Sequence, residues 1–182
     1  MEFEQLAISD LILFKPKIFK DERGFFFESF QAQIFNEAVG RVVTFVQDNH
    51  SQSIKNTLRG LHYQVPPNPQ GKLVRVTRGE VYDVAVDLRQ SSPTFGKYVG
   101  TLLSSENNHQ LWIPEGFAHG FITLSDSADF LYKTTDFYHS TSERSIRWDD
   151  KTLNIDWHLK GEVLLSSKDM IAKDFIEADY FE

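Results

Sequence analysis

Two histidines and a tyrosine lie within segments that are otherwise built from apolar and aromatic residues. His62 is part of LRGLHYQ, His119 of LWIPEGFAHGF and Tyr132 of FLYKTTDFY. An imidazole can exchange a proton near neutral pH, and a phenol can donate one. Each side chain also fits a structural role, as a hydrogen-bonded histidine in a strand or a tyrosine at a sheet edge. Acid–base chemistry and structural roles both stay open at this point.

Further charged, amide and aromatic side chains could bind a polar ligand. Gln47 and Asn49 share one strand face by two-residue alternation, as do His62 and Gln64 on the next expected strand. Arg23 also fits a solvated turn before an edge strand. The candidates are Arg23, Phe26 and Glu28 in KDERGFFFESF, Gln47, Asp48 and Asn49 in QDNHS, Arg59 and Lys72, Tyr138 and Glu143, and Lys168 and Asp169 in LSSKD.

Arg59 poses a geometric problem, because strict alternation points it away from the face that carries His62. Glycine within a strand often marks a bulge, and Gly60 lies between the two residues. We therefore predict a distortion at Gly60 that turns both side chains to the same side. Regular pairing at Gly60 would count against a ligand role for Arg59.

A transition-metal site is not expected. Pro114, Gly116 and His119 form a P-x-G-x-x-H pattern, and in metal-binding cupins the corresponding histidine is a ligand. The H-x-H and carboxylate cluster that such metals need is absent around His62, and two isolated histidines make a poor site. The chain has no cysteine, which excludes disulfides, thiolate nucleophiles and cysteine-bound zinc.

Composition narrows the class of protein further. The 182 residues fit one domain, spanning 1–182, and the formal charge of −7 makes nucleic acid an unexpected partner. An anionic small ligand would need a local cluster of arginine and lysine side chains. No apolar run is long enough to cross a bilayer and no export signal is visible, so we expect a cytoplasmic location away from membranes.

Short runs rich in β-branched and aromatic residues, separated by turn residues, predict a mainly β fold. The clearest unit, 72–89, is expected to form a hairpin around Arg78 and Gly79. One helix is expected at 31–39, ended by Gly40, and another near the C-terminus. Many strands and few helices leave a sandwich, jelly roll or barrel. Further strands are expected at 25–30, 42–50, 58–64, 98–103, 110–113, 120–124 and 128–135.

Taken together, these segments resemble the dTDP-4-dehydrorhamnose 3,5-epimerase family over nearly the whole chain. The resemblance implies a cupin-type jelly-roll antiparallel β-barrel and a homodimer whose N-terminal segments complete the neighbour's site. It implies inversion at carbons 3 and 5 of dTDP-4-keto-6-deoxyglucose without metal or redox cofactor, feeding rhamnose into bacterial surface polysaccharide. The matching segments are KDERGFFFE, QDNHS, LRGLHYQ, QGKLVRVTRGEVYDVAVDLR, SPTFG, LWIPEGFAHGF, FLYKTTDFY, ERSIRW and LSSKD.

The resemblance also implies roles for single residues. His62 matches the base, Asp169 its carboxylate partner, and Tyr132 the acid on the opposite face of the sugar. Lys72 matches the cation beside the oxygen on carbon 4. The implied binding residues are Arg59, His119, Lys168 and, across a dimer, Arg23 for sugar or pyrophosphate, Tyr138 for stacking on thymine, Glu28, Gln47, Asn49 and Glu143 for polar contacts, with Asp48 beside them and Phe26 packed nearby.

Three alternatives remain at this stage. A relative could epimerise only one carbon, which depends on the shape of the pocket. A non-catalytic sugar-nucleotide binding protein would leave His62, Tyr132 and Asp169 without a purpose. A metal-dependent cupin would need a transition metal held by His62 and His119.

Overall fold

The computed structural model describes residues 1–182, in which β-strands dominate. No helix is long and apolar enough to span a membrane. The strands are β1 Glu2–Gln5, β2 Ile12–Lys15, β3 Phe19–Asp21, β4 Gly24–Phe26, β5 Gln47–Ile54, β6 Leu58–Gln64, β7 Lys72–Arg78, β8 Glu80–Asp87, β9 Tyr98–Ser104, β10 Gln110–Ile113, β11 Phe117–Thr123, β12 Ser127–Thr134 and β13 Glu143–Ser145; the helices are α1 Ala32–Val39, α2 Ser167–Met170 and the 3-10 turn Phe175–Glu177.

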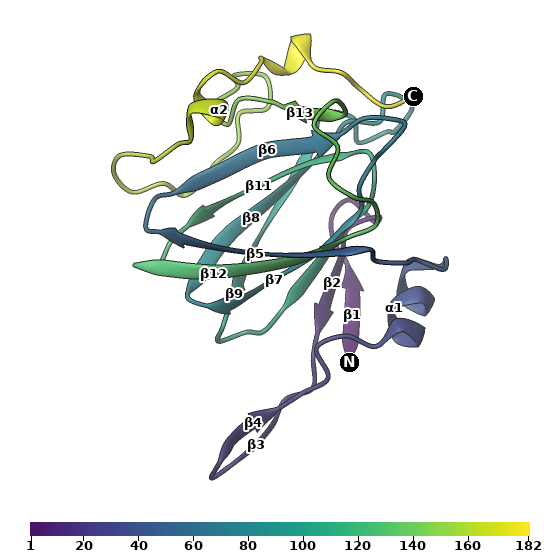
Figure 1. Ribbon diagram of the computed structural model, residues 1–182, viewed down its shortest axis with the longest axis vertical. Helices are drawn as coiled ribbons and strands as arrows, with labels where there is room; N and C mark the ends of the chain where they lie inside the picture. The colour runs from purple at the N-terminus through teal and green to yellow at the C-terminus, as the bar shows by residue number, and fades with distance from the viewer.

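Two antiparallel sheets face each other (Figure 1). The first has the strand order β1-β2-β10-β7-β12-β5 and the second β13-β6-β11-β8-β9, while β3 and β4 form a separate ribbon. The sheets are not joined into one closed barrel. The cupin-type jelly roll is therefore confirmed in the form of a sandwich.

The core lies in three layers, one between the two sheets and one against the outer face of each sheet. Val74 and Phe130 of the first sheet meet Ala85 of the second in the central layer. The C-terminal segment covers the outer face of the second sheet, as seen above β6 in Figure 1. Helix α1 covers part of the outer face of the first sheet through Phe35, which packs edge-on against Trp112. Apolar burial on this scale is the main stabilising contribution to the fold.

The hairpin expected at 72–89 is wrong, although both of its strands exist. β7 pairs with β10 and β12, whereas β8 pairs with β11 and β9 in the facing sheet. The chain turns at Gly79, whose φ of +74° suits glycine, and its carbonyl accepts from the backbone of Ser105. The amide of Glu80 donates to Ser125. These hydrogen bonds to Ser105 and Ser125 fix the chain where it passes from the first sheet to the second. The alternation of apolar residues had predicted a hairpin turn at this point.

Other expected elements agree with the structure to different degrees. The bounds expected for β6 and β10 are those observed, and β9, β11 and β12 differ from expectation by one to three residues at an end. Strand β5 begins five residues later than expected, and only residues 25–26 of the expected strand 25–30 lie in a strand, β4. Helix α1 is capped by Gln31 and ends at Gly40 in the left-handed conformation, as predicted.

The β3–β4 ribbon stands away from both sheets (Figure 1). Its aromatic side chains are exposed, with Phe25 at 62% and Phe26 at 67% of their full accessibility. Large apolar side chains gathered on a projecting ribbon are typical of a surface that another chain covers.

Candidate active site

A cavity of about 250 Å³ lies between the two sheets. Strands β5, β7 and β12 supply one wall, and β6 and β11 supply the other. Six of the predicted site residues line it together: Asn49, Arg59, His62, Lys72, His119 and Tyr132. The remaining lining residues are His50, Ser51, Phe121 and Phe130. Residues far apart in sequence therefore line one cavity, whose side chains are mostly polar and include the aromatic rings of Phe121 and Phe130.

The distortion predicted at Gly60 is confirmed. Between the pairs Arg59–Phe121 and His62–His119, strand β6 has one residue more than β11, so the register shifts there. The extra residue is a bulge, which reverses the alternation that would otherwise separate Arg59 from His62. Both side chains consequently line the same cavity.

Glycine is required at this bulge for two reasons. Gly60 has a φ of +129°, which side chains rarely adopt. A Cβ at Gly60 would also lie 2.5 Å from the Cα of Gly120 on the neighbouring strand. The close approach of the two backbones thus sets the positions of the side chains on either side.

His62 is hydrogen-bonded to a carboxylate. Its Nε2 lies 2.5 Å from Oδ1 of Asp169, and its side chain keeps 29% of its accessibility against 2% for Asp169. Ser166, the N-cap of α2, donates from Oγ to the second oxygen of Asp169 at 2.7 Å. Burial acts to raise the pKa of Asp169, but the hydrogen bonds from His62 and Ser166 outweigh it and hold that pKa below its ordinary value. With Nε2–H donated to Asp169, Nδ1 is the nitrogen left to accept a proton.

Lys72 places a buried ammonium group in the cavity that His62 also lines. Burial lowers the pKa of Lys72 to about 8, against the attraction of Asp83 and Glu143. Its Nζ donates one long hydrogen bond, of 3.4 Å, to the backbone oxygen of His62. The ammonium therefore has spare hydrogen-bonding capacity for a ligand oxygen.

His119 forms a second histidine–carboxylate pair. Its Nε2 lies 2.8 Å from Oδ2 of Asp83, and the side chains keep 8% and 0% of their accessibility. Burial lowers the pKa of His119, against the opposing effect of Asp83. Neither Asp83 nor Ser166 is among the site residues predicted from the sequence. An acid in the apolar alternation of EVYDVAVD was the available signal for Asp83.

Tyr132 reaches the cavity from β12, in the sheet that faces His62. Burial raises the pKa of Tyr132, although the charge of Arg59 opposes this. The phenol is therefore protonated at neutral pH and able to donate. The expected arrangement, with imidazole and phenol on opposite walls, is the one observed.

Polar contacts connect several of the predicted binding residues. Tyr138 donates from its hydroxyl to Glu143 at 3.0 Å, and Glu143 also pairs with Lys168. Gln47 donates to Asn49 at 3.0 Å and accepts from the backbone of Tyr138 at 3.3 Å. The Tyr138 ring itself is exposed, so its face is free to stack.

Eight predicted binding residues do not line the cavity itself. Four of them, Gln47, Tyr138, Glu143 and Lys168, make the polar contacts just described. The other four are Arg23, Phe26, Glu28 and Asp48. Arg23 and Phe26 belong to the projecting ribbon, where Arg23 pairs with Asp21, and Glu28 follows the ribbon in an exposed loop. Asp48 faces outward and pairs with Lys133 at 2.9 Å. Alternation points the Asp48 side chain away from the face that carries Gln47 and Asn49, so a contact from Asp48 to the ligand stays a prediction.

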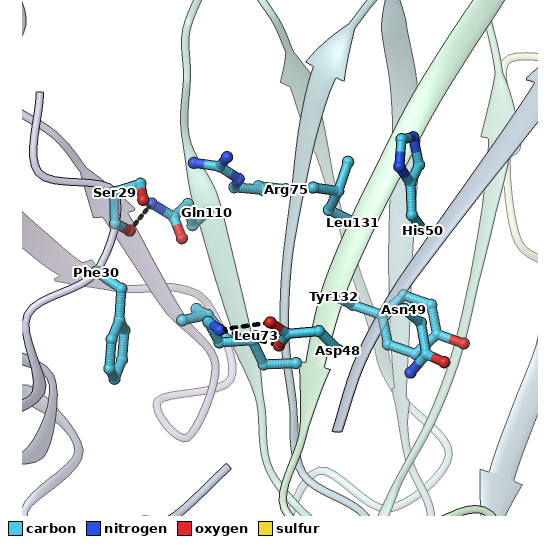
Figure 2. Close-up of a pocket in the computed structure, with 11 residues that line it drawn as sticks. Ser29, Phe30, Asp48, Asn49, His50, Leu73, Arg75, Gln110, Leu131 and Tyr132 are labelled. Atoms are coloured by element: carbon cyan, nitrogen blue, oxygen red, sulfur yellow. Dashed lines mark hydrogen bonds and ion pairs between the residues drawn. The ribbon is translucent and has the colours of Figure 1, made fainter. Parts of the chain in front are cut away.

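A second hollow, of about 270 Å³, lies on the outer face of the first sheet (Figure 2). It is lined by Leu131, Gln110 and Arg75 and bordered by the Asp48–Lys133 pair. Arg75 is half-buried, its pKa is lowered by burial, and its side chain makes no hydrogen bond or ion pair. His50 also lines this hollow, but it is exposed and lies 3.6 Å from Asp129, beyond hydrogen-bonding distance. The cavity between the sheets, with its hydrogen-bonded His62 and His119, remains the candidate active site.

Metal ligands are not gathered anywhere in the chain. No group of three or more histidine and acidic side chains is placed to hold an ion. His62 and His119 lie opposite each other in the strand pairing, but each is bonded to its own carboxylate.

Comparison with known proteins gives concordant results. Residues 5–177 match the family model described as dTDP-4-dehydrorhamnose 3,5-epimerase. The dTDP-4-dehydrorhamnose 3,5-epimerase of Shigella flexneri is 62% identical over 181 residues, covering 100% of this chain and 99% of that protein. The dTDP-4-dehydrorhamnose 3-epimerase of Streptomyces niveus is 36% identical over 98% of this chain and 86% of that protein.

Among solved structures, the dTDP-6-deoxy-D-glucose-3,5-epimerase of Legionella pneumophila in complex with dTDP-4-keto-L-rhamnose superposes with a TM-score of 0.95. It is 55% identical, and the match covers 98% of this chain and 94% of that one. Sequence and fold therefore point to the same group of proteins.

Proposed function

The chain belongs to the dTDP-4-dehydrorhamnose 3,5-epimerase family, and from this premise we propose how its cavity performs that reaction. The enzyme inverts carbons 3 and 5 of dTDP-4-dehydro-6-deoxy-D-glucose, giving dTDP-4-dehydro-L-rhamnose. One observation supports the mechanism above all others. A carboxylate-bound imidazole and a protonated phenol line a single cavity from opposite sheets.

The first step is removal of a hydrogen next to the 4-keto group. Nδ1 of His62 takes the proton, and the C–H electron pair moves into the ring so that the oxygen on carbon 4 becomes an enolate. Asp169 stabilises the resulting imidazolium and fixes the orientation of its ring. Lys72 stabilises the enolate oxygen, and a preorganised charge of this kind lowers the activation free energy by several kcal/mol.

The second step returns a proton from the opposite side. Tyr132 donates its phenolic proton to the carbon, the enolate electrons form the new C–H bond, and the 4-keto group is restored. Inversion follows because the donor and the acceptor stand on different faces of the sugar. The enzyme is reset when His62 loses its proton to solvent and the Tyr132 phenolate regains one. Each turnover therefore exchanges substrate hydrogen with water.

The nucleotide is bound at the rim of the cavity. Tyr138 offers an exposed ring for the base, and Glu143, Gln47 and Asn49 supply polar contacts. Arg59, His119 and Lys168 bind the sugar and the pyrophosphate, and the cations Arg59 and Lys168 give local positive charge to a chain whose net charge is −7.

Turnover in deuterated water tests this function. Incubated with dTDP-4-keto-6-deoxyglucose, the enzyme should incorporate deuterium at carbons 3 and 5, read by NMR of the product. Deuterium at carbon 3 alone would identify a single-carbon epimerase instead. No incorporation, with dTDP still bound in calorimetry, would identify a binding protein and contradict the proposal.

A homodimer completes the site in this proposal. Arg23, Phe26 and Glu28 lie away from their own cavity, and the ribbon beside them exposes large aromatic rings. We place them in the cavity of a second copy. The unpaired, half-buried Arg75 on the outer sheet face gives a second surface that suits a contacting subunit. The enzyme is expected to act in the cytoplasm.

Mixing two inactive variants tests the shared site. The Arg23→Ala subunit has an intact cavity but a defective ribbon. The His62→Asn subunit has a defective cavity but an intact ribbon. A mixed dimer has one complete site, so mixing after subunit exchange should restore a substantial part of the activity. If the ribbon served its own chain, both sites of the mixed dimer would be defective and activity would stay lost.

A further inference from the structure

Asp83 is a fully buried carboxylate in the second sheet, behind the cavity wall. Its Oδ2 accepts from Nε2 of His119 at 2.8 Å, whereas Oδ1 has no hydrogen-bond partner. Burying a charged group with an unsatisfied oxygen is unfavourable, so such a group persists where it serves another purpose.

Asp87 lies four residues after Asp83 on the same face of β8 and serves as a comparison, because its role is structural. It is also fully buried, but both of its oxygens accept hydrogen bonds, from Arg89, Ser92 and Thr94. These bonds tie the end of β8 to the following loop. Asp83 joins no loop and leaves one oxygen free, so fold stabilisation accounts for it poorly.

Asp83 also acts on a charged side chain of the cavity, Lys72. Burial is the main effect on the pKa of Lys72, and Asp83 is the strongest influence that opposes it, ahead of Glu143. Lys168 acts in the other direction. No carboxylate forms an ion pair with the Lys72 ammonium, whose one hydrogen bond is to a backbone oxygen. The protonation of Lys72 thus depends on the charges of Asp83 and Glu143, which are not in contact with it.

We propose that Asp83 is a positioning residue for the epimerisation: it keeps Lys72 protonated and fixes His119 as the tautomer with the proton on Nε2. This role rests on the proposed function, in which the Lys72 ammonium stabilises the enolate. The carboxylate stays behind the wall and touches neither the substrate nor the reacting atoms. It sets the protonation of two side chains that line the cavity.

Asp83→Asn removes the charge while its amide oxygen can still accept from His119. The pH profile of kcat/KM should then lose activity on its basic side about one pH unit or more earlier, because Lys72 deprotonates at lower pH. The other ionisable groups around the cavity, His62, Arg59, Tyr132, Glu143 and Lys168, are unchanged. Affinity for dTDP in calorimetry should stay at the wild-type value. An unshifted basic limb would overturn the proposal.

Asp87→Asn is the matched control, since it should lower thermal stability without moving the basic limb. A double-mutant cycle gives a second readout. In a Lys72→Met background, Asp83→Asn should leave the remaining exchange rate unchanged. The same fold loss in both backgrounds would mean that Asp83 does not act through Lys72.

A measurement on the unmodified enzyme keeps the test open if Asp83→Asn fails to fold. Nitrogen-15 NMR of labelled histidine should show His119 neutral with its proton on Nε2. A proton on Nδ1, or on both nitrogens, would contradict the proposal. This tautomer does not depend on turnover, so an enzyme that lacked exchange activity altogether would refute the proposed function separately.

Discussion

The two histidine–carboxylate pairs of the cavity have the same chemistry and opposite surroundings. His62 keeps 29% of its side-chain accessibility and His119 keeps 8%. Asp169 belongs to the C-terminal segment and is held by Ser166, whereas Asp83 is a strand residue with one oxygen unpaired. The first pair opens to the cavity, while the second is embedded in the wall.

A histidine–carboxylate pair therefore does not define a general base by itself. A base has to reach the substrate and exchange its proton with solvent, which requires partial exposure. A buried pair is better suited to hold a fixed protonation state, because each charge change inside the wall is unfavourable. We therefore assign proton transfer to His62 and the setting of charge to Asp83.

Replacing the exposed base should have the largest effect. His62→Asn should lower the rate of hydrogen exchange about 10³-fold, since general-base catalysis contributes on that order. The rate is measured by NMR in deuterated water. His158→Asn, an exposed histidine beside Tyr82 and outside the cavity, is the control and should retain full activity. Substantial exchange by His62→Asn would remove the distinction between the two pairs.

Lys72→Met should separate activity from stability. We expect kcat to fall about 10²-fold, because a preorganised charge at the enolate oxygen is lost. The same variant should be more stable by about 3 kcal/mol at pH 7, which corresponds to the fall of the Lys72 pKa from 10.5 to about 8 on folding. Chemical denaturation measures this free energy.

The sign of that stability difference can be checked by pH. The folded-state pKa of Lys72 lies below its unfolded value, so the unfolded chain binds a proton more readily. The penalty is absent above about pH 10.5, grows as the pH falls to about 8, and is constant below. A gap between Lys72→Met and the wild type that does not change over this range would contradict the buried-ammonium interpretation.

Ser166→Ala should have a smaller effect that is confined to the exposed pair. It removes the N-cap of α2 and one hydrogen bond to Asp169, which together are worth about 1 kcal/mol. The pKa of Asp169 should rise toward its ordinary value, so the stability loss should shrink as the pH falls through that pKa. We expect kcat to fall by about tenfold or less, and Ser166→Thr should restore it. A variant indistinguishable from the wild type would show that Asp169 needs no support from Ser166.

The fold shows which structural information is local. Short apolar runs located β6 and β10 to the residue, and Gln31 and Gly40 delimited α1, because these signals depend on neighbours in sequence. Pairing across Gly79 was mispredicted, since alternation gives the faces of a strand but not its partner. Strands β7 and β8 lie in different sheets, and the connection between them is held by hydrogen bonds to Ser105 and Ser125, which are distant in sequence.

The site divides in a similar way. The bulge at Gly60 was predicted because the side chains of Arg59 and His62 had to point to the same side of the strand, and the structure contains it. Asp83 was missed because Asp83 and Asp87 look equivalent in a strand whose two faces are both buried. Only tertiary packing shows that Asp87 is fully bonded while Asp83 is not. The placement of Arg23 and Glu28 could not follow from a single chain, because their proposed partner is a second copy.

In the proposed mechanism, a proton leaves to an imidazole on one side of the sugar and returns from a phenol on the other. Tyr132→Phe tests it most directly in deuterated water, with product stereochemistry and deuterium content read in the same NMR spectrum. We expect that His62 still exchanges hydrogen at carbon 3 while the configuration is retained. Deuterated product that is inverted at wild-type efficiency would contradict it.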